Sequence, residues 1–295
     1  MSKKARIRVG TQTSFSALNP VEPFEYAVEN GFDAFEWFPD KKESGEGWEE
    51  SDLDTETRRH IKNTAIRHDM TLSVHVPWMV NPLESKASER LLEDLEFAQD
   101  IGAVLLNIHL YTDEGIDVYV EAITPFIKRL VQTNISLSIE NTPLTAPEDF
   151  NALFVGLGLL EPAAKRRVGM CLDSGHANLY QGTLNEYLMF VDQIDSRVPI
   201  IHVHLHKNYG DADSHLPLFN GPAEKDAFGI QGLLKRLIRR NFSGCLILEY
   251  WPQPPTLLNE ARDTLRAMIR KITPTAEGNG ANTADHAPLR GGVNG

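Results

Sequence analysis

The sequence has few cysteines and no long apolar run. Its 295 residues include only two cysteines, Cys171 and Cys245, and both lie in apolar, strand-like segments. Two such residues build no disulfide framework, so we expect reduced thiols in the core. No apolar stretch approaches the roughly 20 residues that a membrane-spanning helix needs, and no signal-peptide core follows the basic N-terminus. These absences predict a cytoplasmic protein.

Positive charge is also scarce. The chain carries 29 Lys and Arg against 41 Asp and Glu, a formal net charge of −12. Neutralising a phosphate backbone usually supplies most of the affinity for nucleic acid, so the balance counts against nucleic acid as a partner. It favours a small, neutral, sugar-like substrate, and it leaves a homo-oligomer open. Part of the acidity can be used for binding metal.

Strand-like and helix-like segments alternate along the chain. The predicted strands are Ile7–Ser14, Phe32–Phe38, Met70–Val76, Ala103–His109, Ile135–Glu140, Arg167–Asp173, Val198–His206 and Gly244–Tyr250. The predicted helices are Pro20–Asn30, Glu56–His68, Ser85–Ile101, Ile116–Thr133, Pro147–Leu160, Leu184–Ile194, Phe228–Arg240 and Leu257–Ile272.

Repeated βα units imply a parallel sheet. No glycine-rich GxGxxG turn follows the first strand, which removes the main support for a dinucleotide-binding fold. Eight units within residues 1–272 predict a single (β/α)8 TIM barrel of the α/β class. Residues 273–295 are rich in small and polar residues and are predicted to be a disordered tail.

Six of the strand-like segments close on a histidine or a carboxylate. They are Leu72–His75, Val104–His109, Ile135–Glu140, Val168–Asp173, Ile200–His206 and Cys245–Glu249. In a barrel of this kind the C-terminal strand ends line the active site. Imidazole and carboxylate together suit zinc, manganese, iron or cobalt better than calcium, and magnesium also remains a candidate. The pattern therefore predicts a divalent metal centre, with the number of ions per chain open.

The individual residues also have ordinary structural explanations. Glu140 and Glu249 end apolar strands, where a carboxylate must either form an ion pair or bind a metal. Asp173 precedes His176 by three residues, and an aspartate there could simply cap a helix. His75 and His109 occupy matching positions on adjacent strands, which favours function over isolated hydrogen bonding.

The segment around the seventh strand carries the densest group of candidates. His202, His204 and His206 alternate, so all three face one side of the strand. His202 lies deepest and is expected to be a core residue or to support a ligand. The polar segment Lys207–Asp226 follows, and we expect it to fold over the barrel mouth and bring Asp213 and His215 to the centre. Trp251, just after Glu249, is a further candidate.

These residues resemble the xylose-isomerase-like barrel superfamily, which includes sugar epimerases, inosose dehydratases and apurinic endonuclease IV. The resemblance extends over roughly residues 7–272. Its epimerase branch implies a metal set of Glu140, Asp173, His204 and Glu249, with His176 contacting substrate and the two glutamates as the acid/base pair. Its endonuclease IV branch implies nine ligands for three metals: His75, His109, Glu140, Asp173, His176, His204, Asp213, His215 and Glu249.

The chain departs from both branches in places. Lys207 stands where both often have an acidic residue, and Gly210 stands where the epimerase branch has an arginine. The favoured hypothesis is a divalent-metal-dependent isomerase or epimerase of a sugar or polyol, with Glu140 and Glu249 transferring a proton next to a carbonyl. His176, His206, Lys207 and Trp251 would bind the substrate. The alternative is a multinuclear metal phosphoesterase of the endonuclease IV type.

Overall fold

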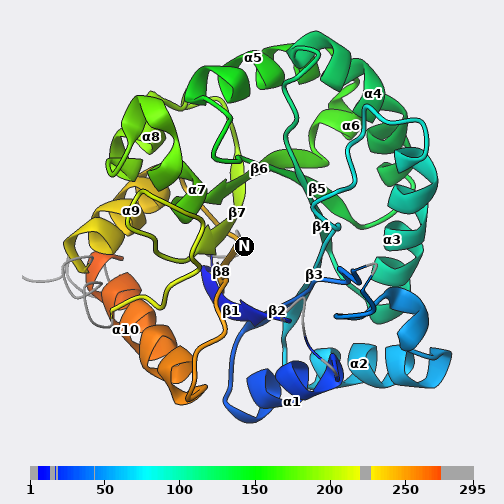
Figure 1. Cartoon of the computed structure of the whole chain (residues 1–295), viewed down its shortest axis with the longest axis vertical. Helices are drawn as coiled ribbons and strands as arrows, with labels where there is room; N and C mark the ends of the chain where they lie inside the picture. The colour runs from blue at the N-terminus through cyan, green and yellow to red at the C-terminus, as the bar shows by residue number, and fades with distance from the viewer. Residues whose placement is uncertain (1–5, 14–16, 18, 43, 220–226, 274–295) are drawn as a thin grey trace, which may run out of the picture.

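The eight predicted strands form a closed parallel barrel. The computed structural model describes residues 6–13, 17, 19–42, 44–219 and 227–273. The strands are β1 (Arg8–Gln12), β2 (Ala34–Trp37), β3 (Thr71–His75), β4 (Leu105–His109), β5 (Ser136–Glu140), β6 (Val168–Asp173), β7 (Ile200–Leu205) and β8 (Cys245–Leu248). Each pairs with its sequence neighbour, and β1 pairs with β8 to close the ring (Figure 1). The fold-class prediction is confirmed.

The helices surround the barrel (Figure 1). They are α1 (Val21–Glu29), α2 (Thr55–Arg67), α3 (Ala87–Ile101), α4 (Ile116–Leu130), α5 (Pro147–Leu157), α6 (Pro162–Lys165), α7 (Ser174–Leu179), α8 (Tyr187–Gln193), α9 (Ala227–Arg239) and α10 (Thr256–Ile272). Gly31 follows α1 with a φ of +68°, a left-handed conformation that glycine adopts without cost. In the described part of the chain, no helix is long and apolar enough to cross a membrane.

Two short helices, α6 and α7, were not predicted. The predicted helix Leu184–Ile194 is also shorter in the structure, where α8 spans only Tyr187–Gln193. The helix α7 begins directly after Asp173, whose carboxylate accepts a hydrogen bond from the His176 backbone N–H at 2.6 Å. The expected tail lies outside the described residues from residue 274 onward.

Alternation along the strands places polar side chains inside the barrel. On β2, Phe35 and Trp37 point outward and pack with Phe24 of α1 in an aromatic cluster, which leaves Glu36 on the opposite face. The strand register then aligns Glu36 with Ser73, and His109 with Glu140. The barrel interior is therefore lined by polar residues, while the apolar core lies between the strands and the helices.

Candidate metal centre

The C-terminal ends of the strands bring the candidate ligands together in three groups. The first group has Glu140 of β5 at its centre. Nε2 of His75 lies 3.2 Å from Oε2 of Glu140, and Nε2 of His109 lies 3.6 Å from Oε1. Glu140 is fully buried, and Asn107 donates a further hydrogen bond to it. No Lys or Arg in the described chain pairs with Glu140, so its partners are imidazoles and an amide.

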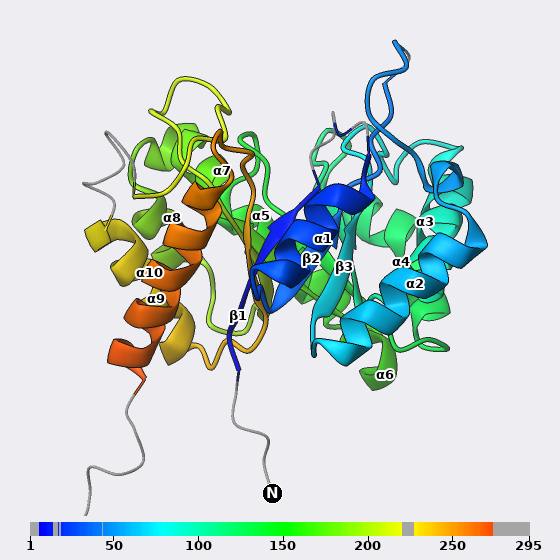
Figure 2. The ribbon, with the colours of Figure 1, turned by 90° about the horizontal axis from the view of Figure 1, so that it is seen from below.

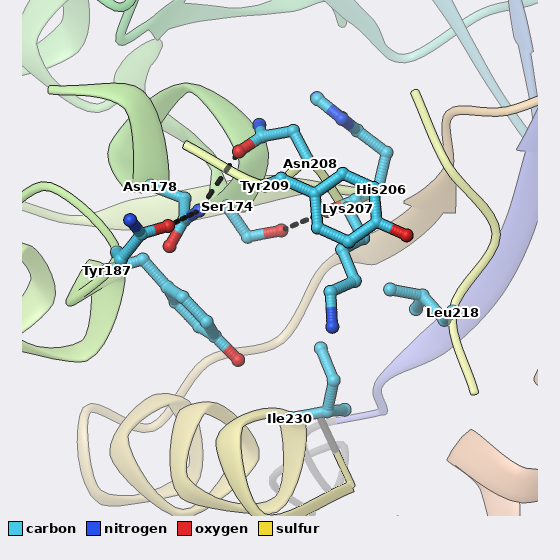
Figure 3. A pocket seen from close by; sticks show the side chains of 10 residues that line it. Ser174, Asn178, Tyr187, His206, Lys207, Asn208, Tyr209, Leu218 and Ile230 are labelled. Atoms are coloured by element: carbon cyan, nitrogen blue, oxygen red, sulfur yellow. Dashed lines mark hydrogen bonds between the residues drawn. The ribbon is translucent and has the colours of Figure 1, made fainter. Parts of the chain in front are cut away.

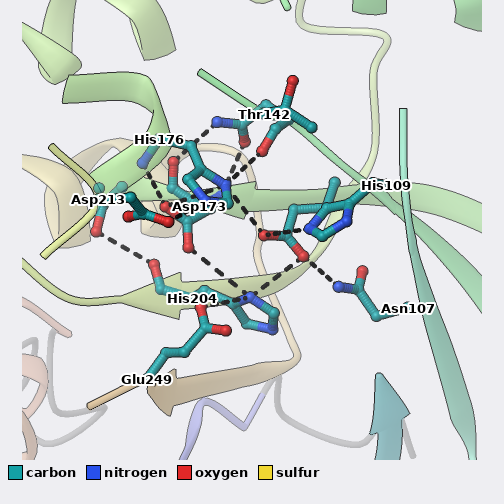
Figure 4. Close-up of polar contacts among 12 residues, drawn as sticks. Asn107, His109, Thr142, Asp173, His176, His204, Asp213 and Glu249 are labelled. Carbon is teal, nitrogen blue, oxygen red and sulfur yellow. Dashed lines mark hydrogen bonds and ion pairs between the residues drawn. The ribbon is translucent and has the colours of Figure 1, made fainter. Parts of the chain in front are cut away.

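The second group surrounds Nδ1 of His204 on β7. This nitrogen lies 3.1 Å from Oε2 of Glu249, 3.3 Å from Oε2 of Glu140 and 3.8 Å from Oδ2 of Asp173 (Figure 4). Three carboxylates from three strands thus converge on one imidazole nitrogen. Glu140 belongs to both groups, so the first and second groups are neighbours that share a carboxylate.

The third group is built by the segment that follows β7. Nε2 of His176 and Nε2 of His215 each lie 3.2 Å from Oδ2 of Asp213. An antiparallel bridge between Lys207 and Leu216 returns the segment toward the barrel, and the segment rises above the strand ends in Figure 2. The structure therefore places Asp213 and His215 beside the strand-end residues.

Backbone carbonyls hold three of the imidazoles. Nδ1 of His75 bonds to the carbonyl oxygen of Val76 at 2.7 Å, Nδ1 of His176 to that of Asn141 at 2.8 Å, and Nδ1 of His215 to that of Glu249 at 2.8 Å. A carbonyl can only accept, so each Nδ1 carries the proton. When a ring gives up its second proton, the lone pair of its Nε2 faces the centre, as a metal ligand requires.

The geometry fits divalent ions. Ligands about 2.0–2.1 Å from a tetrahedral ion are separated from one another by about 3.3 Å, and the ligand-atom distances within the three groups are 3.1–3.8 Å. Oε1 of Glu140, Nδ1 of His204 and Oε2 of Glu249 are buried and have no hydrogen-bond partner within the described part of the chain. Orphaned buried polar atoms are costly, and a bound cation would satisfy all three.

Without metal, the site consists of mutually stabilised charges. Burial alone would raise the pKa of Glu140 and of Glu249, but the nearby imidazoles, that of His204 above all, hold both pKa values well below the usual range. Burial would likewise lower the pKa of His204 and of His215. The surrounding anionic groups instead raise the pKa of His204 well above normal, and that of His215 to about 9.

The centre opens into a cavity of about 470 Å³ at the barrel mouth. Its walls include five side chains besides the candidate ligands: Phe38, Asp40, Lys42, Trp78 and Trp251. The Asp40 carboxylate makes no hydrogen bond or ion pair with any described residue although Asp40 is only 8% exposed. Burial raises its pKa. A pocket of this volume is large enough for a small metabolite.

The other predicted substrate contacts divide between two places. Trp251 lies at the mouth, its ring 5.6 Å from that of His215. Nε2 of His206 lies 3.2 Å from Oδ2 of Asp173, and His206, Asp173 and His176 have ligand atoms within 4.8 Å of one another, which makes His206 a further candidate ligand. Lys207 lines a different cavity, of about 380 Å³, bounded by Ser174, Tyr187 and Ile230 (Figure 3).

Sequence reasoning missed Glu36 of β2. This carboxylate is fully buried beneath the second group. Its Oε2 lies 2.8 Å from Nε2 of His202, and its Oε1 lies 2.8 Å from Nε2 of His204. A carboxylate in the apolar segment Phe32–Phe38 was the available signal, but this strand does not end on the residue. Cys171 was expected in the core and is indeed a free, buried thiol, within 4.8 Å of ligand atoms of Glu140 and His204.

The comparisons with known proteins agree with the barrel fold. The model of the xylose isomerase-like TIM barrel family matches residues 24–270, so the chain belongs to that family. A probable endonuclease 4 from Thermoplasma volcanium is 23% identical over 198 residues, which cover 63% of this chain and 69% of that protein.

Several solved structures have a fold similar to that of this chain. A D-tagatose 3-epimerase-like protein has a TM-score of 0.67 at 20% identity, with 90% of this chain and all of that chain (100%) covered. Endonuclease IV from Thermus thermophilus has a TM-score of 0.62 at 19% identity, with 90% and 99% covered. Members of the superfamily are enzymes that act on different substrates, so the reaction must be argued from the site.

Proposed function

We propose that this protein is a multinuclear, divalent-metal-dependent hydrolase of phosphate esters. The observation that carries the proposal is the completeness of all three ligand groups, with three or four donors in each. A mononuclear isomerase needs only the group around His204. It leaves His75 and His109, and likewise Asp213 and His215, without a role. The three ligand groups therefore favour the multinuclear phosphoesterase over the isomerase that the sequence favoured.

Charge supports the same choice. The ligand carboxylates of Glu140, Asp173, Asp213 and Glu249 bring four negative charges into the centre. Each divalent ion that replaces one imidazole proton adds one positive charge to the centre, so three bound ions attract a phosphate group more strongly than one does.

The residues at the barrel mouth would have different roles in the hydrolysis. Glu140 joins the first and second groups and so fixes the spacing between them. Asp213 holds His176 and His215 at the rim and closes the third group over the cavity. Bound divalent ions would supply positive charge for the phosphate oxygens and would activate the attacking water. Trp78 and Trp251 would enclose the rest of the substrate.

The substrate class follows from the cavity and the surface. A cavity of about 470 Å³ holds a small ester, and a net charge of −12 opposes a long polyanion. We therefore propose a small phosphate ester rather than nucleic acid.

A second candidate function, isomerisation or epimerisation of a sugar or polyol, is favoured by a different observation. The carboxylates of Glu140 and Glu249 both approach Nδ1 of His204, so one ion there would have an acid/base pair beside it. In addition, the Asp40 carboxylate could accept a hydrogen bond from a substrate hydroxyl, whereas it would repel a phosphate.

Metal content and activity distinguish the two candidates. Protein purified without added metal is analysed for Zn, Mn, Fe, Co and Mg, and is then assayed on p-nitrophenyl phosphate, bis(p-nitrophenyl) phosphate, DNA with abasic sites and a set of ketoses. We expect about two to three ions per chain and hydrolysis of the small esters. One ion per chain with ketose epimerisation would establish the second candidate. Cleavage of abasic DNA without hydrolysis of small esters would overturn the proposed substrate class.

A further inference from the structure

We propose that Glu36 is a positioning residue for the metal centre: it holds His204 with Nδ1 toward the ligand carboxylates and thereby sets the affinity of that site for its ion. Both candidate functions use His204, so the inference holds for either. It concerns a residue inside the barrel that contacts no substrate.

Glu36 is held rigidly by its neighbours. Its Oε1 accepts a hydrogen bond from Nε2 of Gln12 at 3.0 Å, and its Oε2 accepts one from the Ser73 hydroxyl at 2.8 Å. Nε2 of His202 donates to the same Oε2 at 2.8 Å. Residues of β1, β3 and β7 thus fix a carboxylate from β2. A charged group this well anchored can orient a neighbour instead of following it.

His204 depends on this carboxylate because no backbone carbonyl of the described residues holds its ring. Three of the other candidate imidazoles bond to backbone carbonyls through Nδ1. The His204 ring is reversed: Nδ1 faces the ligand carboxylates and Nε2 faces Glu36. Nε2 lies 2.8 Å from Oε1 of Glu36, but neither ring nitrogen of His204 forms a directed hydrogen bond with any described residue. The contact is therefore mainly electrostatic.

The charge on Glu36 selects the ring state that a metal needs. A carboxylate 2.8 Å from Nε2 favours the proton on that nitrogen. The lone pair of the neutral ring is then on Nδ1, among Glu140, Asp173 and Glu249. A tautomer with its lone pair on Nε2 would direct that lone pair at the Glu36 oxygen, which is repulsive. Carboxylates that hold metal-binding histidines in this way contribute about 10- to 100-fold to metal affinity.

The test compares Co²⁺ binding to the wild type with binding to Glu36→Gln, Ser73→Ala and His202→Gln. Dissociation constants come from competition with a chelator, the visible absorption of bound Co²⁺ reports its ligand geometry, and thermal unfolding of the metal-free protein reports stability. None of these measurements needs substrate. Glu36→Gln should weaken the tightest Co²⁺ site about 10- to 100-fold and shift its absorption bands, with the same number of ions bound at saturation.

The two other variants are matched controls within the same network. Ser73→Ala removes a donor to Glu36 but keeps the charge, and His202→Gln removes the other imidazole. Both should keep Co²⁺ affinity within about threefold of the wild type and leave its spectrum unchanged, even where the melting temperature falls. A His202→Gln variant that weakens Co²⁺ as much as Glu36→Gln would overturn the proposal, since the network as a whole would then set affinity.

Two further results would also overturn it. Wild-type affinity and spectrum in Glu36→Gln would show that His204 needs no orientation by Glu36. Loss of one whole ion from both Glu36→Gln and His202→Gln would make Glu36 a ligand itself. If Glu36→Gln does not fold, Glu36→Asp replaces it. This variant keeps the charge but withdraws it from the ring, so it should fold and bind Co²⁺ more weakly; unchanged affinity there would refute the proposal.

Discussion

The carboxylates at the two ends of the barrel have different cationic partners. At the end where the strands begin, Arg6 and Arg8 pair with Asp69, at 2.6 and 3.0 Å. At the mouth, the carboxylates pair with imidazoles. Guanidinium is always charged and has no lone pair to offer, so the arginines of the first arrangement cannot bind a metal ion. An imidazole can exchange its proton for a metal ion, so the second arrangement can also bind a ligand.

Cavity size alone would point to the end where the strands begin. The hollow beside Arg6 and Arg8 has a volume of about 770 Å³, against about 470 Å³ at the mouth. The mouth is distinguished by its chemistry, because its carboxylates and imidazoles lie at ligand-to-ligand distances and several of their buried atoms lack a hydrogen-bond partner among the described residues. What separates a functional end from a structural end in this barrel is therefore the type of cationic partner each carboxylate has.

The largest expected effect tests the carboxylate that two groups share. Glu140→Gln keeps the shape but removes the charge, so both the first and the second group should bind metal poorly. Activity, in whichever assay detects it, should fall roughly 10²- to 10⁴-fold. Kinetics and elemental analysis measure the two effects. Glu121→Gln, on the exposed face of α4, is the matched control. A Glu140→Gln variant with normal metal content and turnover would remove the mouth from consideration as the active end.

The loop after β7 offers a test of the third group alone. Asp213→Ala combined with His215→Ala should lower metal content by about one ion per chain, while the groups around Glu140 and His204 stay loaded. Asp211→Ala is the control, since this exposed residue of the same loop accepts a hydrogen bond from the neighbouring Ala212 N–H and has no other hydrogen-bond partner among the described residues. Unchanged metal content in the double variant would mean that the loop only covers the surface, and the isomerase would become the better proposal.

The contrast between imidazole and guanidinium also predicts a pH dependence. The anionic neighbours raise the pKa of His75, His176, His204 and His215, the last to about 9. His215 is therefore protonated at neutral pH in the metal-free protein, and the raised pKa of the other rings means that each holds its proton more tightly than a free imidazole does. A ring must lose its extra proton to bind an ion. The metal affinity of the third group, which contains His215, should rise with pH up to about 9, by roughly tenfold per unit for each proton displaced.

Calorimetry of Zn²⁺ binding in buffers of different ionisation enthalpy measures the protons released. Release of one or more protons per ion at pH 7 is the expected result. Binding without proton release, with an affinity that is flat between pH 6 and 8, would contradict the charge state described for the site.

Much of this site could be predicted from the sequence, because strand ends in a parallel barrel meet at one place. His75, His109, Glu140 and Asp173 each close a strand in the structure, as their segments indicated. Asp173 shows why competing interpretations need not exclude one another. Its Oδ1 caps α7, as an ordinary aspartate would, and its Oδ2 faces His204 and His206.

The role of Glu36 and the orientation of Lys207 could not be predicted, because both depend on contacts between segments that are far apart in the sequence. Glu36 was missed because it precedes the end of β2, and its importance comes from β7, across the barrel and 166 residues later in the chain. Lys207 directly follows the His204–His206 run, but its side chain lines the cavity beside α7 and α9 rather than the mouth. Spacing along a loop does not determine which way a side chain turns.

The smallest expected effect completes the comparison at the other end of the barrel. Arg6 is 55% exposed and its partner Asp69 is 70% exposed, so solvent screens their attraction and the pair is worth less than about 1 kcal/mol. Arg6→Ala should therefore lower the free energy of unfolding by no more than that, as measured by urea denaturation, and should leave metal content unchanged. A loss of bound metal in this variant would show that the two ends are coupled, and that the end where the strands begin does more than hold the structure together.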